Sequence, residues 1–502
     1  MTATQTTTDL ASYDLFVDGR WVPAAEGATM ERTSPADGRL VGRYARGAAA
    51  DVDAAVTAAR KAFDDSSWPT SPAQERSAIL QRAAALLRER AGDIGRRITL
   101  ELGKPIGLAR SEVQLTADVF DYYAALANDL REDAISRHTP DALGLVLREP
   151  VGVVAMITPW NFPLLLLAWK VGPAIAAGCT MIAKPASATP GGALELARVL
   201  QDAGLPDGVY NVVTGGGGEV GTALARHPGV DKVAFTGSTE VGREIMAAAA
   251  GDIKKVSLEL GGKSPNVVFP DADLKQAVRG AYWGIFLNTG QACQAGSRLL
   301  VHRELHDQFT DGLIEMAAKS RIGDPLDDKT MIGPVVDEGQ LKTVTDYIER
   351  GREEGAQLLH GGARLTDGEL GRGLFVEPTV FDGVAPGMSI GREEIFGPVL
   401  SVMTFVDVDD AVRLANDNMY GLAAAVWTKD LDVAFTTAKG IRAGTVWVNA
   451  YHDAGLAFVL PFGGYKASGI GRELGREGLD EYLEKKAIHI RLSRPSTAQR
   501  TS

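Results

Sequence analysis

The stretch VGVVAMITPWNFPLLLLAWKVGPAIAAGCTMIAK, residues 151–184, decides the fold of this chain. Its first eight residues are mostly apolar, as expected of a buried strand, and residues 163–177 read as a helix. Residues 179–183 are apolar again and read as a second buried strand. A helix between two buried strands predicts neighbouring parallel strands, with the helix packed on their sheet.

The same alternation continues on both sides of this stretch, so we expect an α/β protein with parallel sheets covered on both faces. Short strands are predicted before residue 47, helices from 51 to 130, and a second alternating block at 264–461. The other predicted strands lie at 209–213, 232–235, 256–259, 266–269, 298–301, 400–405 and 487–492. The other predicted helices lie at 191–203, 218–226, 239–250, 271–288, 304–320 and 338–354.

Composition restricts the class of protein. The chain has 502 residues, of which 45% are hydrophobic and 23% charged, as in a soluble globular protein with two or three domains. A net charge of −12 without a long Lys/Arg block argues against a nucleic-acid or membrane partner. Two cysteines, no signal-peptide pattern and no bilayer-spanning apolar stretch predict a cytoplasmic location.

A carboxylate and a thiol, each beside glycines, are the main candidates for chemistry. Glu259 ends an apolar strand-like run and precedes two glycines, and Cys293 follows Gly290 by three positions. Glycines let a backbone come close to a ligand, and the ends of parallel strands are common ligand sites. A thiolate can attack a carbonyl carbon, and a carboxylate can activate the water that releases the product.

Two predicted turns offer polar groups to a ligand. Asn161, after the first strand of the opening stretch, carries an amide that can donate to an oxyanion. Residues 235–242, FTGSTEVG, place backbone N–H groups at a helix start, where a phosphate can bind. Residues 216–221 formally match G-x-G-x-x-G, but Glu240 opens a helix instead of facing a ribose, so this match carries little weight.

Seven motifs follow one another along the chain. They are Pro159-Trp160-Asn161-Phe162-Pro163, Lys184-Pro185-Ala186, Phe235-Thr236-Gly237-Ser238, Glu259-Leu260-Gly261-Gly262-Lys263, Gly290-Gln291-Ala292-Cys293, Glu394-Ile395-Phe396-Gly397-Pro398 and Pro461-Phe462-Gly463-Gly464. Together they resemble the aldehyde dehydrogenase superfamily, and the resemblance extends over nearly the whole chain. The motifs are specific for the superfamily and not for one substrate.

The resemblance implies the oxidation of an aldehyde to a carboxylic acid with NAD or NADP. Cys293 would form a thiohemiacetal whose oxyanion Asn161 stabilises, and Glu259 would activate the water that hydrolyses the thioester. Lys170 and Glu473 resemble a family pair that relays protons from this base. The cofactor contacts implied are Ile157, Thr158, Pro159, Trp160, Lys184, Ser187, Gly217, Phe235, Thr236, Gly237, Ser238, Val241, Leu260, Gly261, Glu394 and Phe396.

The family fold implies three parts in this chain. A Rossmann-like cofactor domain would comprise residues 1–127 and 151–261, and a second α/β catalytic domain residues 262–475. A β-strand oligomerisation extension would comprise residues 128–150 and 476–502, within a homodimer or homotetramer.

Ser187 departs from the pattern of many NAD-preferring members, which have a glutamate three positions after the lysine of the Lys184 motif. That carboxylate would repel a 2′-phosphate by about 4 kcal/mol at 4 Å and an effective dielectric constant of 20. With serine the repulsion is absent and Lys184 can pair with the phosphate, so we expect NADP to be tolerated or preferred.

The predicted substrate pocket is apolar, which favours aliphatic or aromatic aldehydes over acidic semialdehydes. Its candidate residues are Phe162, Leu166, Trp169, Ala292, Gln294, Phe458 and Phe462, with residues 451–458 at the entrance.

The alternative functions are a semialdehyde dehydrogenase of a catabolic pathway, a CoA-acylating dehydrogenase, a cysteine hydrolase or esterase, and a non-catalytic binding protein. Glu259 argues against CoA, and the phosphate-binding turn against a hydrolase. Scattered histidines and the absence of Cys-x-x-Cys argue against a metal enzyme.

Overall fold

The computed structural model describes residues 10–139, 141–452 and 458–492. In it the stretch 151–184 folds as the sequence predicts. It forms β8 (Val153–Ile157), α5 (Leu165–Ala177) and β9 (Thr180–Lys184). The two strands pair in parallel, with Val153 opposite Thr180 and Ile157 opposite Lys184. The parallel pair with its crossover helix is confirmed.

The side chains of β8 enter two separate cores because successive residues of a strand point to opposite faces. Val153 and Ile157 pack in the core that also contains residues of α1 (Ala49–Asp64). Val154 and Met156 pack in the core that contains α5 and α6 (Gly191–Asp202). Both faces of the sheet are therefore covered, which explains the continuous apolar sequence of the strand.

The strand order of this sheet is β20-β12-β11-β8-β9-β10-β2-β3. The chain passes from β8 to β9 and β10 on one side and then returns to β11 and β12 on the other. Strand order therefore reverses beside β8, and a ligand crevice is expected outside the carboxyl ends of the strands at this point. The remaining bounds are β2 (Leu15–Val17), β3 (Arg20–Val22), β10 (Tyr210–Val212), β11 (Lys232–Thr236), β12 (Lys255–Glu259), β20 (Gly469–Ile470), α7 (Thr222–Arg226) and α8 (Thr239–Ala249).

The second lobe contains a sheet of order β15-β16-β17-β14-β13-β18-β19, in which all pairs except β15–β16 are parallel. Helices again cover both faces, since Val267 and Val268 of β13 pack in different cores. The strands are β13 (Pro265–Val268), β14 (Arg298–His302), β15 (Gln357–His360), β16 (Thr379–Asp382), β17 (Val399–Phe405), β18 (Ala423–Trp427) and β19 (Thr445–Val448). The helices are α9 (Leu274–Phe286), α10 (His306–Ala318), α11 (Glu338–Glu353), α12 (Ser389–Arg392), α13 (Val408–Asn416) and α14 (Leu431–Gly440). The last helix, α15 (Gly475–Asp480), returns to the first lobe and packs on α5.

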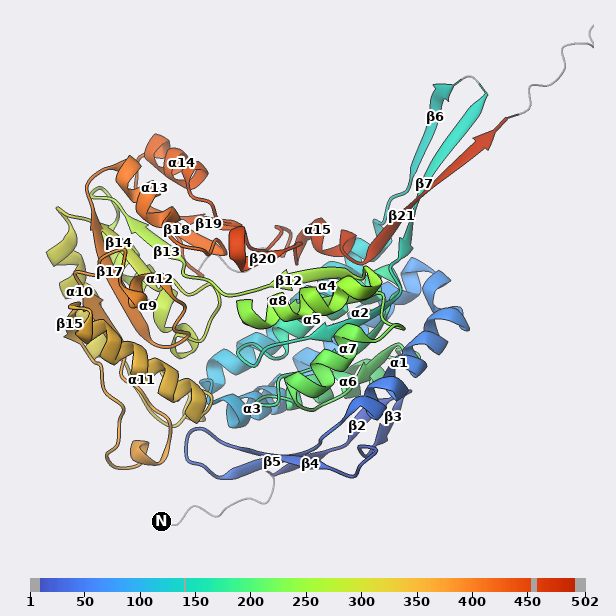
Figure 1. Cartoon of the computed structure of the whole chain (residues 1–502), viewed down its shortest axis with the longest axis horizontal. Helices are drawn as coiled ribbons and strands as arrows, with labels where there is room; N and C mark the ends of the chain where they lie inside the picture. Colours follow the sequence, from blue (N-terminus) through green and yellow to red (C-terminus); the bar gives the residue numbers. More distant parts are fainter. Residues whose placement is uncertain (1–9, 140, 453–457, 493–502) are drawn as a thin grey trace, which may run out of the picture.

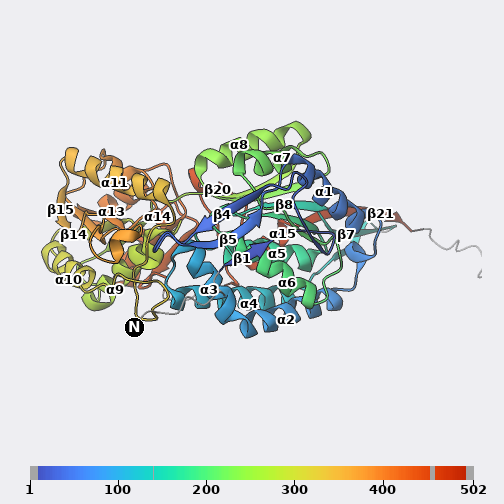
Figure 2. The same cartoon turned by 90° about the horizontal axis from the view of Figure 1, so that it is seen from below.

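The amino-terminal region packs on the first lobe (Figure 2). It contains a small sheet of order β1-β5-β4, made of β1 (Ala11–Tyr13), β5 (Leu40–Ala45) and β4 (Thr29–Thr33). The helices α2 (Ala73–Glu89), α3 (Ala91–Leu102) and α4 (Ile106–Asn128) pack beside α5 and α6.

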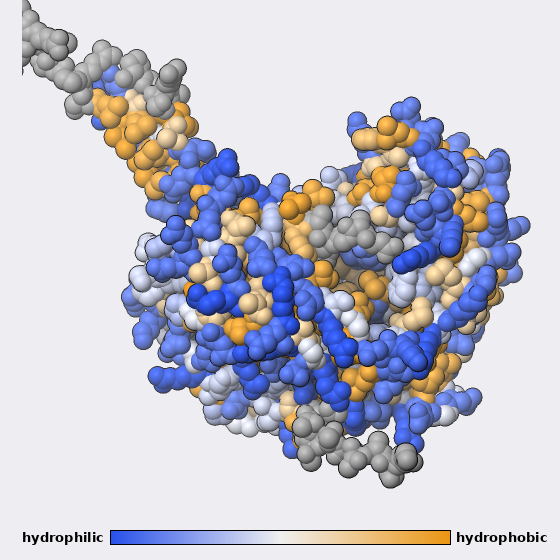
Figure 3. All heavy atoms as spheres, turned by 180° about the vertical axis from the view of Figure 1, so that it is seen from behind, coloured by the Kyte–Doolittle hydropathy of each residue, from blue (hydrophilic) through white to orange (hydrophobic). Residues whose placement is uncertain are grey.

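A β-sheet arm of order β21-β7-β6 projects from the body (Figure 1). Its strands are β6 (Asp133–Thr139), β7 (Ala142–Pro150) and β21 (Leu483–Arg491), and β21 pairs with β7 along its whole length. Apolar side chains are exposed along the arm, among them Ile135 and Ile490 (Figure 3).

The predicted fold class, with a Rossmann-like sheet and a second α/β lobe, is confirmed. β20 differs from expectation, because residues 469–470 lie in sequence with the second lobe but pair with β12 of the first sheet. Of the predicted entrance loop, residues 453–457 lie outside the described residues.

Candidate active site

A cavity of about 1100 Å³ lies at the carboxyl ends of β8, β9, β11 and β12 and reaches into the second lobe. All the predicted cofactor contacts except Ser187 line it. Cys293, Asn161 and Leu166 line it as well. The cavity therefore brings the nucleophile candidate and the expected dinucleotide crevice together.

Cys293 follows a turn of unusual backbone geometry. Asn288, Thr289 and Gly290 have φ values of 51°, 60° and 72°, in the left-handed region. A β-carbon at Gly262 would lie 2.4 Å from the Cys293 carbonyl oxygen, so only glycine permits this approach between the two motifs.

The Cys293 thiol is half-buried and is held in its neutral form. Burial, and then the charges of Glu394 and Glu259, raise the pKa of the thiol to about 12. Because only the thiolate is strongly nucleophilic, the thiol must transfer its proton to a base as it attacks.

Asn161 is 1% exposed and lies where the chain leaves β8. Its Nδ2 donates to the carbonyl of Gln291 at 3.1 Å, two residues before Cys293. A side-chain amide has two N–H groups, so the second can point at a ligand.

Glu259, at the end of β12, is 4% exposed, and both its carboxylate oxygens lack a hydrogen-bond partner among the described residues. Burial, and then the charge of Glu473, raise the pKa of Glu259 well above its usual value, while Lys170 and Arg472 oppose the shift. A buried carboxyl group whose oxygens have no hydrogen-bond partner can accept a proton from water and return it.

Lys170 and Glu473 meet as predicted, in a buried ion pair next to Glu259. Lys170 is fully buried, its ammonium contacts a Glu473 carboxylate oxygen, and it donates to the Thr236 hydroxyl at 2.6 Å. The other oxygen of Glu473 has no partner among the residues described.

The first-lobe end of the cavity offers donors for phosphate and ribose groups. Ser238 caps α8, its hydroxyl accepting from the Val241 N–H at 3.3 Å, and Gly237, Ser238 and Val241 bring the start of this helix to the wall of the cavity. Burial lowers the pKa of Lys184 to about 8. The buried Thr158 hydroxyl has no partner within the described part of the chain and is available to a ligand.

The Glu394 carboxylate reaches this cavity from the second lobe. It accepts from the Gly262 N–H at 3.0 Å, and burial raises its pKa to about 7. Phe396 has a φ of 58°, and its ring meets that of Trp160 edge-on at 5.2 Å between centroids.

Ser187 and most of the predicted substrate residues lie outside this cavity. Ser187 is exposed on the loop after β9, and its hydroxyl donates to the Gly215 carbonyl at 2.9 Å.

Among the predicted substrate residues, Trp169 packs edge-on against Phe462 with 5.1 Å between the ring centroids, and both side chains are buried. Gln294 bonds to Nδ1 of His452 at 2.9 Å. Ala292 is buried, and Phe162 and Phe458 are half-buried against the first-lobe core.

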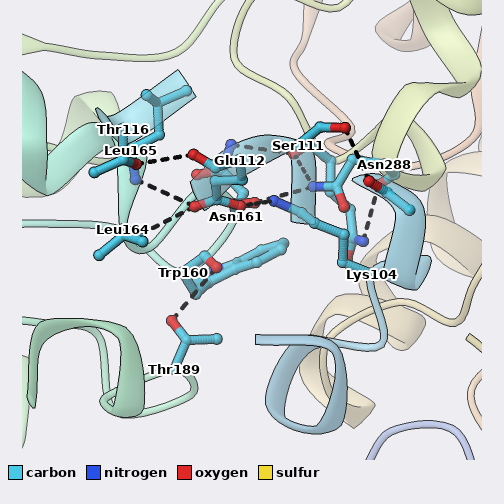
Figure 4. A network of polar contacts seen from close by, with 12 residues as sticks. Lys104, Ser111, Glu112, Thr116, Trp160, Asn161, Leu164, Leu165, Thr189 and Asn288 are labelled. Carbon is cyan, nitrogen blue, oxygen red and sulfur yellow. Dashed lines mark hydrogen bonds and ion pairs between the residues drawn. The ribbon is translucent and has the colours of Figure 1, made fainter. Parts of the chain in front are cut away.

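A polar network behind Asn161 was not predicted (Figure 4). The buried ammonium of Lys104 pairs with Glu112 of α4 and lies 3.8 Å from the centre of the Phe162 ring. Glu112 also accepts from the Leu164 and Leu165 N–H groups at 3.0 and 3.2 Å. In the sequence these charges lie eight positions apart in a polar helical region, which gives no sign of burial.

Asn288 was also missed as a candidate. Its Nδ2 donates to the carbonyl oxygens of Asn161 and Gln291, each at 3.1 Å.

In the described ranges no helix is long and apolar enough to cross a membrane, and no cluster of three or more His, Cys, Asp or Glu side chains could hold a metal ion.

Comparison with known proteins agrees with this geometry. The model of the aldehyde dehydrogenase family matches residues 21–488. The crystal structure of an NAD-dependent aldehyde dehydrogenase from Sinorhizobium meliloti is 47% identical, with a TM-score of 0.94 over 97% of this chain and 96% of that chain. The NAD+ complex of betaine aldehyde dehydrogenase from Staphylococcus aureus is 38% identical, with a TM-score of 0.94 over 98% and 96%. The mitochondrial benzaldehyde dehydrogenase of Antirrhinum majus is 43% identical over 96% of this chain and 90% of its own length. The resemblance drawn from the seven motifs is confirmed, and the chain belongs to the aldehyde dehydrogenase family.

Proposed function

We propose that this protein oxidises an aldehyde to its carboxylic acid with NAD+ or NADP+, through a covalent intermediate on Cys293. The observation that carries the proposal is the shared cavity, in which Cys293 and Asn161 line the same space as the start of α8 and the ends of the parallel strands.

The residues of the cavity fit a dinucleotide. Thr158 offers an unpartnered buried hydroxyl, and added β-carbons at Gly217 and Gly218 would meet no atom within 4 Å, so this wall leaves room for a ligand. The start of α8 would hold the pyrophosphate, Lys184 the adenine ribose, and Glu394 with Phe396 the nicotinamide ribose. When bound, the nicotinamide accepts the hydride that the substrate carbon loses.

The first half of the reaction uses Cys293 and Asn161. The Cys293 sulfur bonds to the carbonyl carbon as its proton passes to a water molecule in the cavity, and the carbonyl oxygen becomes an oxyanion. The free N–H of Asn161, with the backbone N–H of Cys293, would stabilise this charge. One such donor contributes roughly 10²–10³ in rate.

The second half uses Glu259. After oxidation the acyl group is a thioester on Cys293, and Glu259 takes a proton from the water that attacks it. The C–S bond then breaks, the acid leaves, and the Cys293 sulfur takes a proton from solvent, which restores the thiol. The charges of Glu473 and Lys170 act on Glu259 from a buried ion pair, and we assign to this pair the relay of its proton towards solvent.

Substrate, assembly and location are further parts of the proposal. Leu166, Phe162 and the Trp169–Phe462 pair carry no charge, which favours an apolar aliphatic or aromatic aldehyde over an acidic semialdehyde. The arm, with its exposed apolar residues, supports a homodimer or homotetramer, because large exposed apolar surfaces mark interaction sites. We assign the cofactor domain, catalytic domain and extension as the sequence suggests, and a cytoplasmic location.

The absorbance of reduced cofactor, followed with a panel of aldehydes, both cofactors, and with or without CoA, tests the proposal. We expect turnover of apolar aldehydes without CoA. A strict need for CoA would indicate the acylating class, and ester hydrolysis without any aldehyde oxidation would indicate a cysteine hydrolase. Highest turnover of a semialdehyde acid would contradict the substrate assignment.

A further inference from the structure

We propose that Asn288 is a positioning residue that ties the oxyanion donor Asn161 to the loop carrying Cys293. The two groups come from different lobes, since Asn161 follows β8 and Cys293 precedes β14. Catalysis requires that their separation be held within a fraction of an ångström.

Asn288 makes a closed ring of hydrogen bonds across this junction (Figure 4). Its side-chain amide donates to the backbone carbonyl of Asn161 and to that of Gln291, and the Asn161 amide donates to the same Gln291 carbonyl. Both N–H groups of Asn288 are therefore committed, one to each lobe. Two carbonyl acceptors also fix which end of the amide faces them.

The Asn288 backbone is locked in place by its own loop. Its carbonyl accepts from the Gln291 N–H and from Gln291 Nε2, both at 3.1 Å, and Gln291 Oε1 accepts from the Val336 N–H at 2.9 Å. Asn288 is 1% exposed, so these bonds do not compete with solvent. Glycine could adopt the left-handed φ of 51° at this position, but it could not make the two side-chain hydrogen bonds.

The inference rests on the proposed chemistry at Cys293, and two reactions test it separately. Aldehyde oxidation is measured with cofactor, and hydrolysis of p-nitrophenyl acetate is measured without it. The variants are Asn288→Asp, which keeps size and left-handed tolerance but cannot donate, and Asn288→Gly, which keeps only the backbone freedom. Thr289→Ser, at the neighbouring left-handed position, is the matched control, because it keeps the hydroxyl that donates to the Gly333 carbonyl at 3.1 Å.

We expect both Asn288 variants to lower kcat about 10²–10³-fold in both reactions, as for loss of one oxyanion donor, with little change in KM or in cofactor Kd. The same substitution in an Asn161→Ala background should produce almost no further loss, because the two residues act as one unit. Thr289→Ser should keep a kcat close to that of the wild type.

Near-normal activity of Asn288→Gly would overturn the inference, because the left-handed backbone conformation alone would then account for the asparagine at this position. If the fold losses in kcat caused by the Asn288 substitution and by Asn161→Ala multiply in the double variant, the two residues act independently, which would also overturn the inference. A wild type that hydrolyses the ester but oxidises no aldehyde would refute the proposed function, while the ester reaction would still decide the role of Asn288. If Asn288→Asp does not fold, Asn288→Gly with the same double variant supplies the test.

Discussion

The Glu394 carboxylate accepts a hydrogen bond from the Gly262 N–H at 3.0 Å, which joins the loop after β12 to the second lobe. This contact requires a bare backbone, since a β-carbon at Gly261 would lie 2.2 Å from Glu394 Oε2. The two glycines thus do more than make room for a ligand. They seat a carboxylate that faces the cavity.

Gly261→Ala should displace Glu394 and weaken cofactor binding. Loss of hydrogen bonds to a charged group costs about 1.5–3 kcal/mol, so we expect cofactor Kd to rise roughly tenfold to a hundredfold. Titration of protein fluorescence with NAD+ measures it. Gly216→Ala is the control, because its added β-carbon meets no atom within 4 Å and Gly216 does not line the cavity. Equal affinities for the two variants would refute the role given to Glu394.

Glu259→Gln should separate the two halves of the reaction. Glutamine keeps the size of the side chain but cannot accept a proton from water, so the thioester should accumulate. We expect one burst of reduced cofactor per active site, followed by steady turnover about 10²–10⁴-fold slower than in the wild type. Stopped-flow absorbance measures the burst. Unchanged steady turnover would remove Glu259 from the deacylation step.

The raised pKa of Cys293 predicts a distinct pH profile for its alkylation by iodoacetamide in the cofactor-free protein. Since a thiol reacts as the thiolate, and the folded pKa of about 12 lies far above that of a free thiol, the rate should still be rising at pH 10. Mass spectrometry of the Cys293 peptide measures the rate, and Cys179, fully buried, serves as an internal control. A plateau near the pKa of a free cysteine would contradict the assignment.

The Lys104–Glu112 ion pair predicts an order of stabilities. Lys104→Met leaves a buried carboxylate unpaired and should cost about 3–5 kcal/mol. Adding Glu112→Gln removes that charge while keeping an acceptor for the Leu164 and Leu165 N–H groups, so the double variant should be more stable than Lys104→Met alone. Thermal unfolding midpoints at one protein concentration test this. If the double variant has a lower unfolding midpoint than Lys104→Met, the unpaired charge of Glu112 is not the main cause of the lost stability.

The parts of the fold that sequence could predict are those with a strong local pattern. The stretch 151–184 was read correctly because a strand buried on both faces is continuously apolar and its crossover helix is long. β18, Ala-Ala-Ala-Val-Trp, has no such signal, since alanine favours helices and only pairing with β13 and β19 makes it a strand.

The same limit applies to the site. Cys293 and Asn161 were predicted from their motifs, and the structure places them on one cavity. Asn288 and the Lys104–Glu112 pair were missed, because their roles come from contacts across lobes or between helices. Alone, an asparagine in a turn and two charges in a region predicted to be helical are ordinary surface features.

Ser187 gives the prediction on cofactor choice. Ser187→Glu should lower kcat/KM for NADP+ more than for NAD+, because a carboxylate near the ribose repels a 2′-phosphate. The full repulsion of about 4 kcal/mol applies at 4 Å, and solvent at this exposed position reduces it, so we expect the NADP+/NAD+ ratio to fall roughly tenfold to a hundredfold.

The pH dependence of the same ratio tests the part of Lys184 in binding the 2′-phosphate. Burial lowers its pKa to about 8, so the lysine is charged and attracts the phosphate below pH 8, and loses that charge above it. Because kcat/KM reports groups of the free enzyme, kcat/KM for NADP+ should decline above pH 8 relative to NAD+. Lys184→Met should abolish this relative decline. A wild-type ratio far below one, unmoved by either substitution or by pH, would show that the 2′-phosphate never approaches these side chains.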